Sequence, residues 1–330
     1  MPATANGVTV DFRALIAQQS VRRRRWQELR EGLIERFLLL NGVLAVVLIA
    51  LIFVFLFKEG VQALESIPLH RLIGSEVRSF LSGTMEFRMI WQPVSTDPKY
   101  SIVPLVVGSL MIAIPGTLIA TIFGIGIGIY LSEVASERVR EVAKPVIELL
   151  AGIPTVVLGF FCLAVLATVL QQIYDTTYRL NALLGGLGVS LVIIPVIASL
   201  TEDALRMVPD DIRAASYALG ANRWETIWRA LLPAAISGVS GSVILGIGRA
   251  LGETMIVLMA AGNAALVTAN IFSPVRTMTA TIAAELGAVD HGSPHYYALF
   301  LVGSLLFTIT FFVNLTAEVV INRARRKLKL

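Results

Sequence analysis

The stretch Ala234–Gly262, AAISGVSGSVILGIGRALGETMIVLMAAG, decides the fold class of this chain. Its 29 residues include a single basic side chain, Arg249, and a single acidic one, Glu253. A helix crosses a bilayer core of about 30 Å with about 20 predominantly apolar residues. Long unbroken apolar runs indicate helices rather than the alternating strands of a barrel. The stretch therefore predicts a membrane-spanning helix.

Five further apolar stretches lie on either side of it. They are Phe37–Phe57, Ile102–Leu131, Val146–Leu170, Ala182–Leu200 and Tyr296–Ile321. The chain of 330 residues is 56% hydrophobic and 15% charged, whereas a soluble domain carries about 25% charged residues. The one cysteine, Cys162, cannot form an intrachain disulfide. This composition excludes a soluble enzyme, a disulfide scaffold and a disordered tail, and we predict an all-α integral membrane protein with six transmembrane helices.

Basic residues are concentrated on one side of these stretches. With the N-terminus inside, 19 of the 27 Lys and Arg residues fall in the internal segments 1–36, 132–145, 201–233 and 322–330. Seven fall in the external segments 58–101, 171–181 and 263–295, and Arg249 lies within a span. Because cytoplasmic loops are enriched in Lys and Arg, we predict that the N- and C-termini are both cytoplasmic.

The chain divides into four predicted parts. Residues 1–36 form a cytoplasmic N-terminal amphipathic segment, 37–101 the first transmembrane helix and an external loop, 102–322 the transmembrane core with a cytoplasmic loop at 201–233, and 323–330 a basic cytoplasmic tail. The N-terminal segment fits either a helix lying on the membrane surface or a solvated basic tail that sets topology. The external loop carries five basic and five acidic residues, which predicts a small structured cap or docking surface.

The internal segment 201–233, TEDALRMVPDDIRAASYALGANRWETIWRALLP, predicts two short helices. Pro209–Asp211 opens the first, since acidic groups favour the N-terminal end of a helix, and Gly220 offers a stop. Asn222 and Glu225 resemble a capping box for the second. One face of the first helix is apolar, at Ile212, Ala215 and Leu219. The segment fits a helix–turn–helix that projects into the cytoplasm, or two amphipathic helices lying on the bilayer.

Three further patterns limit the chemistry of the chain. There is no GxxxxGK[ST] motif, so the chain is not predicted to hold ATP phosphates by itself. Gly292 and Pro294 separate His291 from His295 and break any helix that would align them, so no metal site is predicted. The alternating glycines of Gly124–Gly128 predict close helix packing.

Arg249 is the only Lys or Arg in the six stretches. It follows Pro233 by 16 residues, about 24 Å along a helix, which places it near the middle of the bilayer. A charge there costs at least ~2.5–3.5 kcal/mol on insertion scales. Glu253 lies four residues later, on the same helix face, and can neutralise it. We predict that the pair lines a substrate path; the alternative is a salt bridge that fixes packing.

The internal segment resembles a known loop. The run Ala214-Ala215-Ser216-x3-Gly220-x11-Leu232-Pro233 is similar to the EAA loop of binding-protein-dependent ABC importer permeases, whose coupling helix fits a groove on the ATPase subunit. It departs from that pattern at Ala214, Ser216 and Ala230, where the family usually has Glu, Ala and Ile. The resemblance implies that ATPase coupling involves Asp211, Ala214, Ala215, Ser216, Leu219 and Gly220.

A closer resemblance covers about residues 37–322. Segments similar to phosphate-importer permeases are Glu148–Phe161 (ELLAGIPTVVLGFF), Gly248–Thr254 (GRALGET), Gly262-Asn263 and Arg276–Leu286 (RTMTATIAAEL). The large loop after the first span and the HYYALF run favour the PstC-type subunit over its PstA-type partner. The resemblance implies the type I ABC importer permease fold and a permease subunit of an ATP-driven phosphate importer in the bacterial cell membrane.

That family also implies the partners. They are a PstA-type permease, a PstB-type ATPase dimer, a PstS-type phosphate-binding protein and membrane lipid, with no nucleic acid. The chain itself would be no enzyme and bind no cofactor, because ATP and Mg are used by the ATPase subunit. The alternative function is an ion-coupled secondary transporter of a small anion, which would predict inverted halves and more than one ionisable cluster within the membrane.

The chemistry of the Arg249–Glu253 pair agrees with phosphate. A guanidinium offers paired N–H donors that match two oxyanion oxygens. A carboxylate repels most anions, but phosphate at neutral pH keeps an O–H that can donate to it, whereas sulfate has none. The pair leaves the anion's charge uncompensated, so a further cation from a second permease chain is expected.

Overall fold

The computed structural model describes the backbone of residues 12–78 and 85–327 and the side chains of residues 30–76 and 86–319. Residues 1–11 of the predicted N-terminal segment and 328–330 of the predicted tail lie outside the described residues. The chain forms two units, Met1–Leu56 and Phe57–Leu330, which we describe separately. The division predicted at 101/102 stays a prediction.

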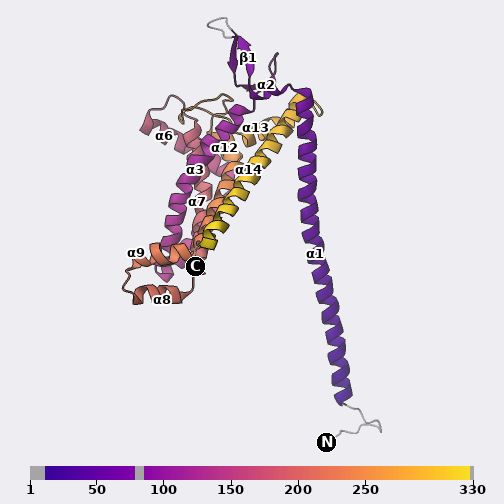
Figure 1. Ribbon diagram of the computed structural model, residues 1–330, viewed down its shortest axis with the longest axis vertical. Helices are drawn as coiled ribbons and strands as arrows, with labels where there is room; N and C mark the ends of the chain where they lie inside the picture. The colour runs from indigo at the N-terminus through magenta and orange to yellow at the C-terminus, as the bar shows by residue number, and fades with distance from the viewer. Residues whose placement is uncertain (1–11, 79–84, 328–330) are drawn as a thin grey trace. The chain divides into compact units, whose positions relative to one another are not determined.

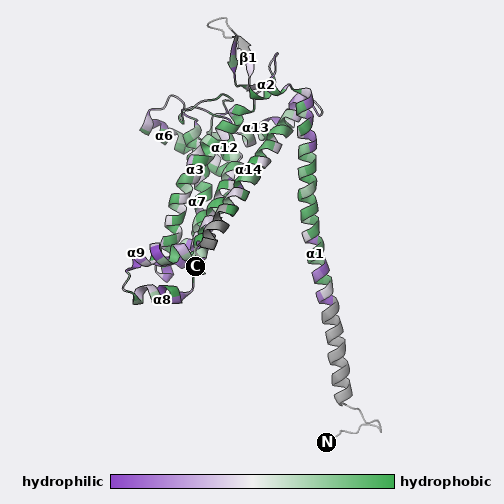
Figure 2. Cartoon of the chain, in the orientation of Figure 1, coloured by the Kyte–Doolittle hydropathy of each residue, from purple (hydrophilic) through white to green (hydrophobic). Residues whose placement is uncertain are grey.

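The first unit is built on helix α1 (Phe12–Ser66), which continues into the second unit. Within α1, Arg30–Ser66 is long and apolar enough to cross a membrane, and it extends the predicted span Phe37–Phe57 at both ends. Figure 2 shows this hydrophobic stretch in green. Its leucine, valine, isoleucine and phenylalanine side chains are exposed, as expected for a helix surrounded by lipid.

The segment after α1 is folded into short elements. Helix α2 (Leu69–Ile73) precedes strands β1 (Ser75–Arg78) and β2 (Met85–Arg88), which pair antiparallel with Ser75 opposite Arg88. Strands β3 (Trp91–Gln92) and β4 (Lys99–Tyr100) form a second antiparallel pair. Trp91 is buried and packs edge-on against Tyr100. These elements lie at one end of the bundle of the second unit (Figure 1).

Helices α3 (Val103–Ile129) and α7 (Ala182–Arg206) form the centre of the bundle. A Cβ added at Gly124 would lie 2.7 Å from Ile197 Cβ, and one added at Gly128 would lie 2.7 Å from Thr201 Cβ. Small residues let helices approach closely in a membrane, so the predicted packing role is confirmed for these two glycines. Gly126 faces away, with nothing within 4 Å of an added Cβ.

The predicted single span Val146–Leu170 is wrong, because the helix is broken. Helix α4 (Glu137–Ala151) ends before Pro154, which has no N–H to donate and which disfavours the α conformation in the residue before it. The apolar helical run then resumes at Thr155 through α5 (Thr155–Phe161), η2 (Cys162–Leu166) and α6 (Ala167–Tyr174). The candidate span is therefore Thr155–Tyr174.

The predicted span Ala234–Gly262 is also interrupted. Helix α11 (Ile236–Gly252) ends at Glu253, whose backbone is extended (φ −65°, ψ 131°), and α12 (Met255–Ala260) follows as a separate helix. Before α11, the run α9 (Arg223–Thr226), η3 (Ile227–Leu231) and α10 (Leu232–Ala234) meets it at a bend of 74°. In the described chain five helices can cross a membrane, or six when this bent pair is one span.

The chain ends with a long helix. Helix α13 (Met278–Glu285) and the short η4 (Leu286–Ala288) lead to α14 (Pro294–Lys327), whose part Pro294–Val319 is a candidate span. It packs against α11 and α13. The predicted helical membrane architecture is confirmed, with two short antiparallel strand pairs added between α2 and α3.

Candidate functional site: an intramembrane cavity and a helix pair at the end of the bundle

The predicted helix–turn–helix is confirmed. Helix α8 (Asp210–Ala218) has two acidic residues in its first turn, and Gly220 follows in the left-handed conformation (φ 83°). The Asn222 side chain accepts from the N–H of Glu225, and the Glu225 carboxylate accepts from the N–H of Asn222, which completes the capping box. Figure 1 shows α8 and α9 at the end of the bundle opposite β1 and α2.

A groove of about 630 Å³ lies between α8 and the helical run from α9 to α10. Its lining residues are Ile212, Ala215, Ser216, Leu219, Gly220, Ala221, Glu225, Arg229 and Ala230. Four of the predicted coupling residues therefore share one surface (Ala215, Ser216, Leu219, Gly220), while Asp211 and Ala214 are exposed beside it. Leu219 is 88% exposed, so this face offers an apolar contact to another protein.

Arg213 fastens α8 to the bundle. Its guanidinium donates to Glu133 Oε1 (2.8 Å) and to the carbonyl oxygens of Leu205 (2.9 Å) and Val208 (2.7 Å). Glu133 lies in η1 (Tyr130–Val134), directly after α3. The hydrogen bond to Glu133 raises the pKa of Arg213 above its ordinary value, so the side chain stays charged. Arg213 therefore joins α8 to the ends of α3 and α7.

A second charged cluster joins α4 to the end of α7. Lys144 donates to Glu202 and Asp203, and Arg206 Nη1 lies 3.7 Å from Glu202 Oε1. The Glu202 side chain is 1% exposed. Burial lowers the pKa of Lys144, but the hydrogen bonds to Asp203 and Glu202 outweigh that effect, and the pKa lies above its ordinary value.

The structure does not pair Arg249 with Glu253. Helix α11 stops at Gly252, so the two side chains do not share a helix face, and no ion pair within 4.0 Å joins them. Glu253 Oε1 instead accepts from the N–H groups of Thr254 (3.0 Å), Met255 (3.1 Å) and Ile256 (3.3 Å) at the start of α12. The prediction of a pair on one helix face is wrong, because the carboxylate caps a helix that hydropathy could not reveal.

Arg249 faces a different set of residues. Its Nε is buried and has no hydrogen-bond partner among the residues whose side chains are described. It lines a cavity of about 550 Å³ with Val196, Gly241, Ile244, Leu245, Gly248, Asn314 and Glu318. Sequence reasoning missed Asn314 and Glu318, although their spacing of four residues inside the last apolar stretch would have placed both on one helix face.

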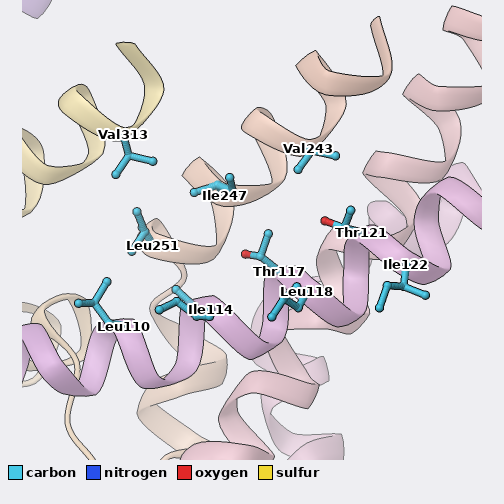
Figure 3. Close-up of a pocket in the computed structure, with 11 residues that line it drawn as sticks. Leu110, Ile114, Thr117, Leu118, Thr121, Ile122, Val243, Ile247, Leu251 and Val313 are labelled. Atoms are coloured by element: carbon cyan, nitrogen blue, oxygen red, sulfur yellow. The ribbon is translucent and has the colours of Figure 1, made fainter. Parts of the chain in front are cut away.

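A second cavity, of about 450 Å³, is apolar (Figure 3). It lies between α3 and α11, where Leu110, Ile114 and Leu118 approach Ile247 and Leu251. Such a lining offers no charge to an anion, and burying an ion without compensation is costly. Of these two cavities, only the one lined by Arg249 offers a positive charge.

A third polar cluster lies at the β1–α2 end. Glu285, at the end of α13, accepts from Arg276 (2.7 Å), from His295 Nε2 (2.9 Å) and from Trp91 Nε1 (3.0 Å). It ties three segments together: the loop after α1, α13 and the start of α14. Within the part of the chain that the structure describes, no cluster of His, Cys, Asp and Glu could hold a metal ion.

The apolar spans, the helix pair at one end and the charged cavity between spans define a class, the membrane-embedded permease subunits of transporters. Residues 124–326 match the family described as "Binding-protein-dependent transport system inner membrane component". This chain belongs to that family.

Two relatives agree with this assignment. Over 323 residues the chain is 32% identical to "Phosphate transport system permease protein PstC" of Xylella fastidiosa strain 9a5c, covering 91% of this chain and 94% of that protein. Over 221 residues it is 38% identical to "Probable ABC transporter permease protein YqgH" of Bacillus subtilis strain 168, covering 67% and 72%.

The fold is also that of an ABC importer permease. A chain of a bacterial ABC transporter involved in the import of the acidic polysaccharide alginate aligns with a TM-score of 0.58 at 14% identity, over 91% of this chain and 99% of that one. A chain of the MetNI methionine ABC transporter aligns with a TM-score of 0.55 at 15% identity, over 68% and 95%. The predicted permease fold is confirmed, and the alternative of an ion-coupled secondary transporter is not supported.

Proposed function

We propose that this chain is the PstC-type permease subunit of an ATP-driven phosphate importer. The observation that carries the proposal is the likeness to a named phosphate permease over 91% of the chain, joined with a guanidinium in a cavity between spans. An arginine within a membrane span faces a cavity or a protein partner rather than lipid, and its paired donors match oxyanion oxygens. Arg249 would supply the positive charge of the phosphate path.

Glu253 would serve the same path by shaping the backbone, whereas the sequence predicted that it neutralises Arg249. It holds the break between α11 and α12 open by capping the start of α12, and Thr279 Oγ1 donates to its backbone carbonyl (2.8 Å). Non-helical backbone at membrane depth is tolerated where it is buried in protein or lines a cavity. We assign Glu253 to positioning the break beside Arg249 rather than to neutralising that arginine.

The groove at α8 would bind the ATPase. Ala215, Ser216, Leu219 and Gly220 line it, and Asp211 and Ala214 flank it. A PstB-type ATPase dimer would use ATP and Mg on its own subunits and pull on α8, and Arg213 would pass that movement to α3 and α7. This chain would bind no cofactor itself.

The remaining partners follow from the same assignment. A PstA-type permease would complete the phosphate path, and a PstS-type protein would deliver phosphate at the β1–α2 end. The complex would lie in the bacterial inner membrane with both termini of this chain in the cytoplasm, in agreement with the distribution of basic residues.

Phosphate uptake by the assembled complex tests the proposal. The chain is expressed with its three partners in cells that lack their own high-affinity phosphate importer, and radiolabelled phosphate uptake is measured per complex recovered by pull-down of the ATPase. The wild-type complex is expected to restore uptake, and Arg249→Gln to abolish it. A wild-type complex that assembles and hydrolyses ATP without taking up phosphate would refute the proposal.

A reporter fusion tests the topology separately. A reporter inserted in the turn 93–98 between β3 and β4 is expected to lie outside, and reporters at residues 3 and 328 are expected to lie in the cytoplasm. A cytoplasmic reading for the loop would overturn the proposed orientation.

A further inference from the structure

We infer that Asn314 and Glu318 of α14 complete an oxyanion site with Arg249, and that the site selects an oxyanion that keeps a proton. The inference rests on the proposed function and adds two side chains that would hold phosphate in its path. It starts from the cavity of about 550 Å³, where these three are the polar and charged side chains among the lining residues.

The cavity brings the three side chains together from two packed helices. Arg249 comes from α11, and Asn314 and Glu318 follow each other by one turn on α14. Residues four apart lie on the same helix face, so the amide and the carboxylate are presented side by side. Gly248 lies directly opposite Asn314, because a Cβ added at Gly248 would lie 3.6 Å from Asn314 Oδ1, an ordinary van der Waals contact.

The donors of Arg249 are available to a ligand that enters the cavity. A guanidinium has five N–H donors, and the buried Nε of Arg249 has no hydrogen-bond partner among the described residues. Buried polar groups in native proteins are nearly always hydrogen-bonded, and each exception calls for an explanation. An oxyanion with several acceptor oxygens provides one.

Glu318 explains why the anion must keep a proton. It lines the same cavity as Arg249, and the described residues show no salt bridge between the two side chains. A carboxylate held near a bound anion repels it, unless the anion donates an O–H to it. Monohydrogen and dihydrogen phosphate both carry such a group, and sulfate at neutral pH does not. Asn314 can both donate to and accept from the same anion.

Glu318 suits this role better than Glu253. One oxygen of Glu253 is already occupied by three N–H groups of α12. Glu318 is exposed on the lone chain and accepts no hydrogen bond from the described residues. A charged side chain on a membrane-spanning helix faces protein or a water-filled space rather than lipid. We therefore place the site on the side of α14 that a second permease covers, within the path between the two chains.

The test compares three variants of the complete importer by initial rates of radiolabelled phosphate uptake per assembled complex. Glu318→Leu removes the acceptor, and Asn314→Leu removes the amide while adding an apolar side chain that a membrane helix accepts. Thr316→Val, on the same helix but not among the cavity-lining residues, is the matched control. We expect at least a tenfold loss of uptake for the first two and a change of less than twofold for the control.

The outcomes separate this inference from the proposed function. Near-normal uptake by Glu318→Leu and Asn314→Leu, in complexes whose wild type imports phosphate, would overturn the site and leave the proposed function standing. If Glu318→Leu fails to assemble, Asn314→Leu decides alone. If Asn314 and Glu318 only stabilise the assembly, their variants would lower the abundance of the complex and leave the uptake rate per complex unchanged. That result would also overturn the inference.

Discussion

Carboxylates with little exposure to solvent hold both ends of the bundle, but the two ends distribute the charge differently. At the external end, as we orient the chain, Glu285 alone binds Arg276, His295 and Trp91. At the cytoplasmic end two carboxylates form separate ion pairs. Glu202 pairs with Lys144, Arg206 and Arg140. Glu133 pairs with Arg213.

This difference bears on how the two ends move. One carboxylate shared by three segments makes the external end a single rigid junction, because every partner loses its contact when that group is lost. The cytoplasmic end has separate connections, one between α4 and α7 and one between α8 and the bundle. Separate connections allow α8 to transmit a displacement while α4 and α7 stay joined. We expect the external end to be more sensitive to a single substitution.

Glu285→Ala is expected to have the largest effect. It leaves the Arg276 guanidinium, whose side chain is 17% exposed, without its carboxylate and also removes the acceptor of Trp91. Breaking a buried pair by removing one partner costs about 3–5 kcal/mol. Thermal unfolding of the purified complex should show a clear loss of stability, whereas Glu76→Ala, at an exposed position of β1, should change little. Equal stability of the two variants would contradict a junction at Glu285.

Glu202→Ala is expected to cause the second-largest loss of stability. The Glu202 side chain is 1% exposed, but Lys144 and Arg206 are 27% and 44% exposed and can take up water when it is removed. The cost should therefore be about 3 kcal/mol, near the lower end for a buried ion pair. The same unfolding experiment measures it, with Glu76→Ala again as the control at an exposed carboxylate. A larger loss than for Glu285→Ala would reverse the comparison between the two ends.

The sequence predicted the cytoplasmic end better than the spans. The helix pair at 201–233 was signalled by local features, namely the acidic first turn, Gly220 and the Asn222–Glu225 box, which act within a few residues. The broken spans were not, because Pro154 and Glu253 lie within apolar runs whose hydropathy is unchanged by a break. From the sequence alone, a glutamate that caps a helix cannot be distinguished from one that neutralises an arginine, as Glu253 shows.

Only part of the candidate site could be predicted from the sequence. Arg249 stood out because a lone basic residue in a span is costly. Glu318 lies near the end of the last apolar stretch, where an acidic residue is less unusual, and its place beside Arg249 depends on how α11 packs on α14. Sequence spacing within one helix cannot supply a contact between two helices.

Arg213→Lys tests the transmission at the cytoplasmic end. Lysine keeps the charge but cannot donate at once to Glu133 and to the carbonyl oxygens of Leu205 and Val208. Hydrogen bonds to charged groups contribute about 1.5–3 kcal/mol each. We expect phosphate uptake per ATP hydrolysed to fall while the ATPase still co-purifies. The matched variant Arg229→Lys makes the same exchange at a residue that lines the groove, so an equal loss in both variants would argue against a specific connection.

Substitution of Gly220 is expected to have the smallest effect of the four, and it tests whether the groove binds the ATPase. Its φ of 83° is the left-handed conformation, and an added Cβ would meet nothing within 4 Å, so any cost comes from the backbone and not from a clash. Valine should pay about 1–2 kcal/mol there, while asparagine visits this conformation readily. Gly220→Val should thus weaken pull-down of the ATPase and lower uptake, and Gly220→Asn should keep both. Since the two side chains are similar in size, equal impairment would mean that the groove excludes any side chain at this position, and equal tolerance would remove Gly220 from the coupling surface.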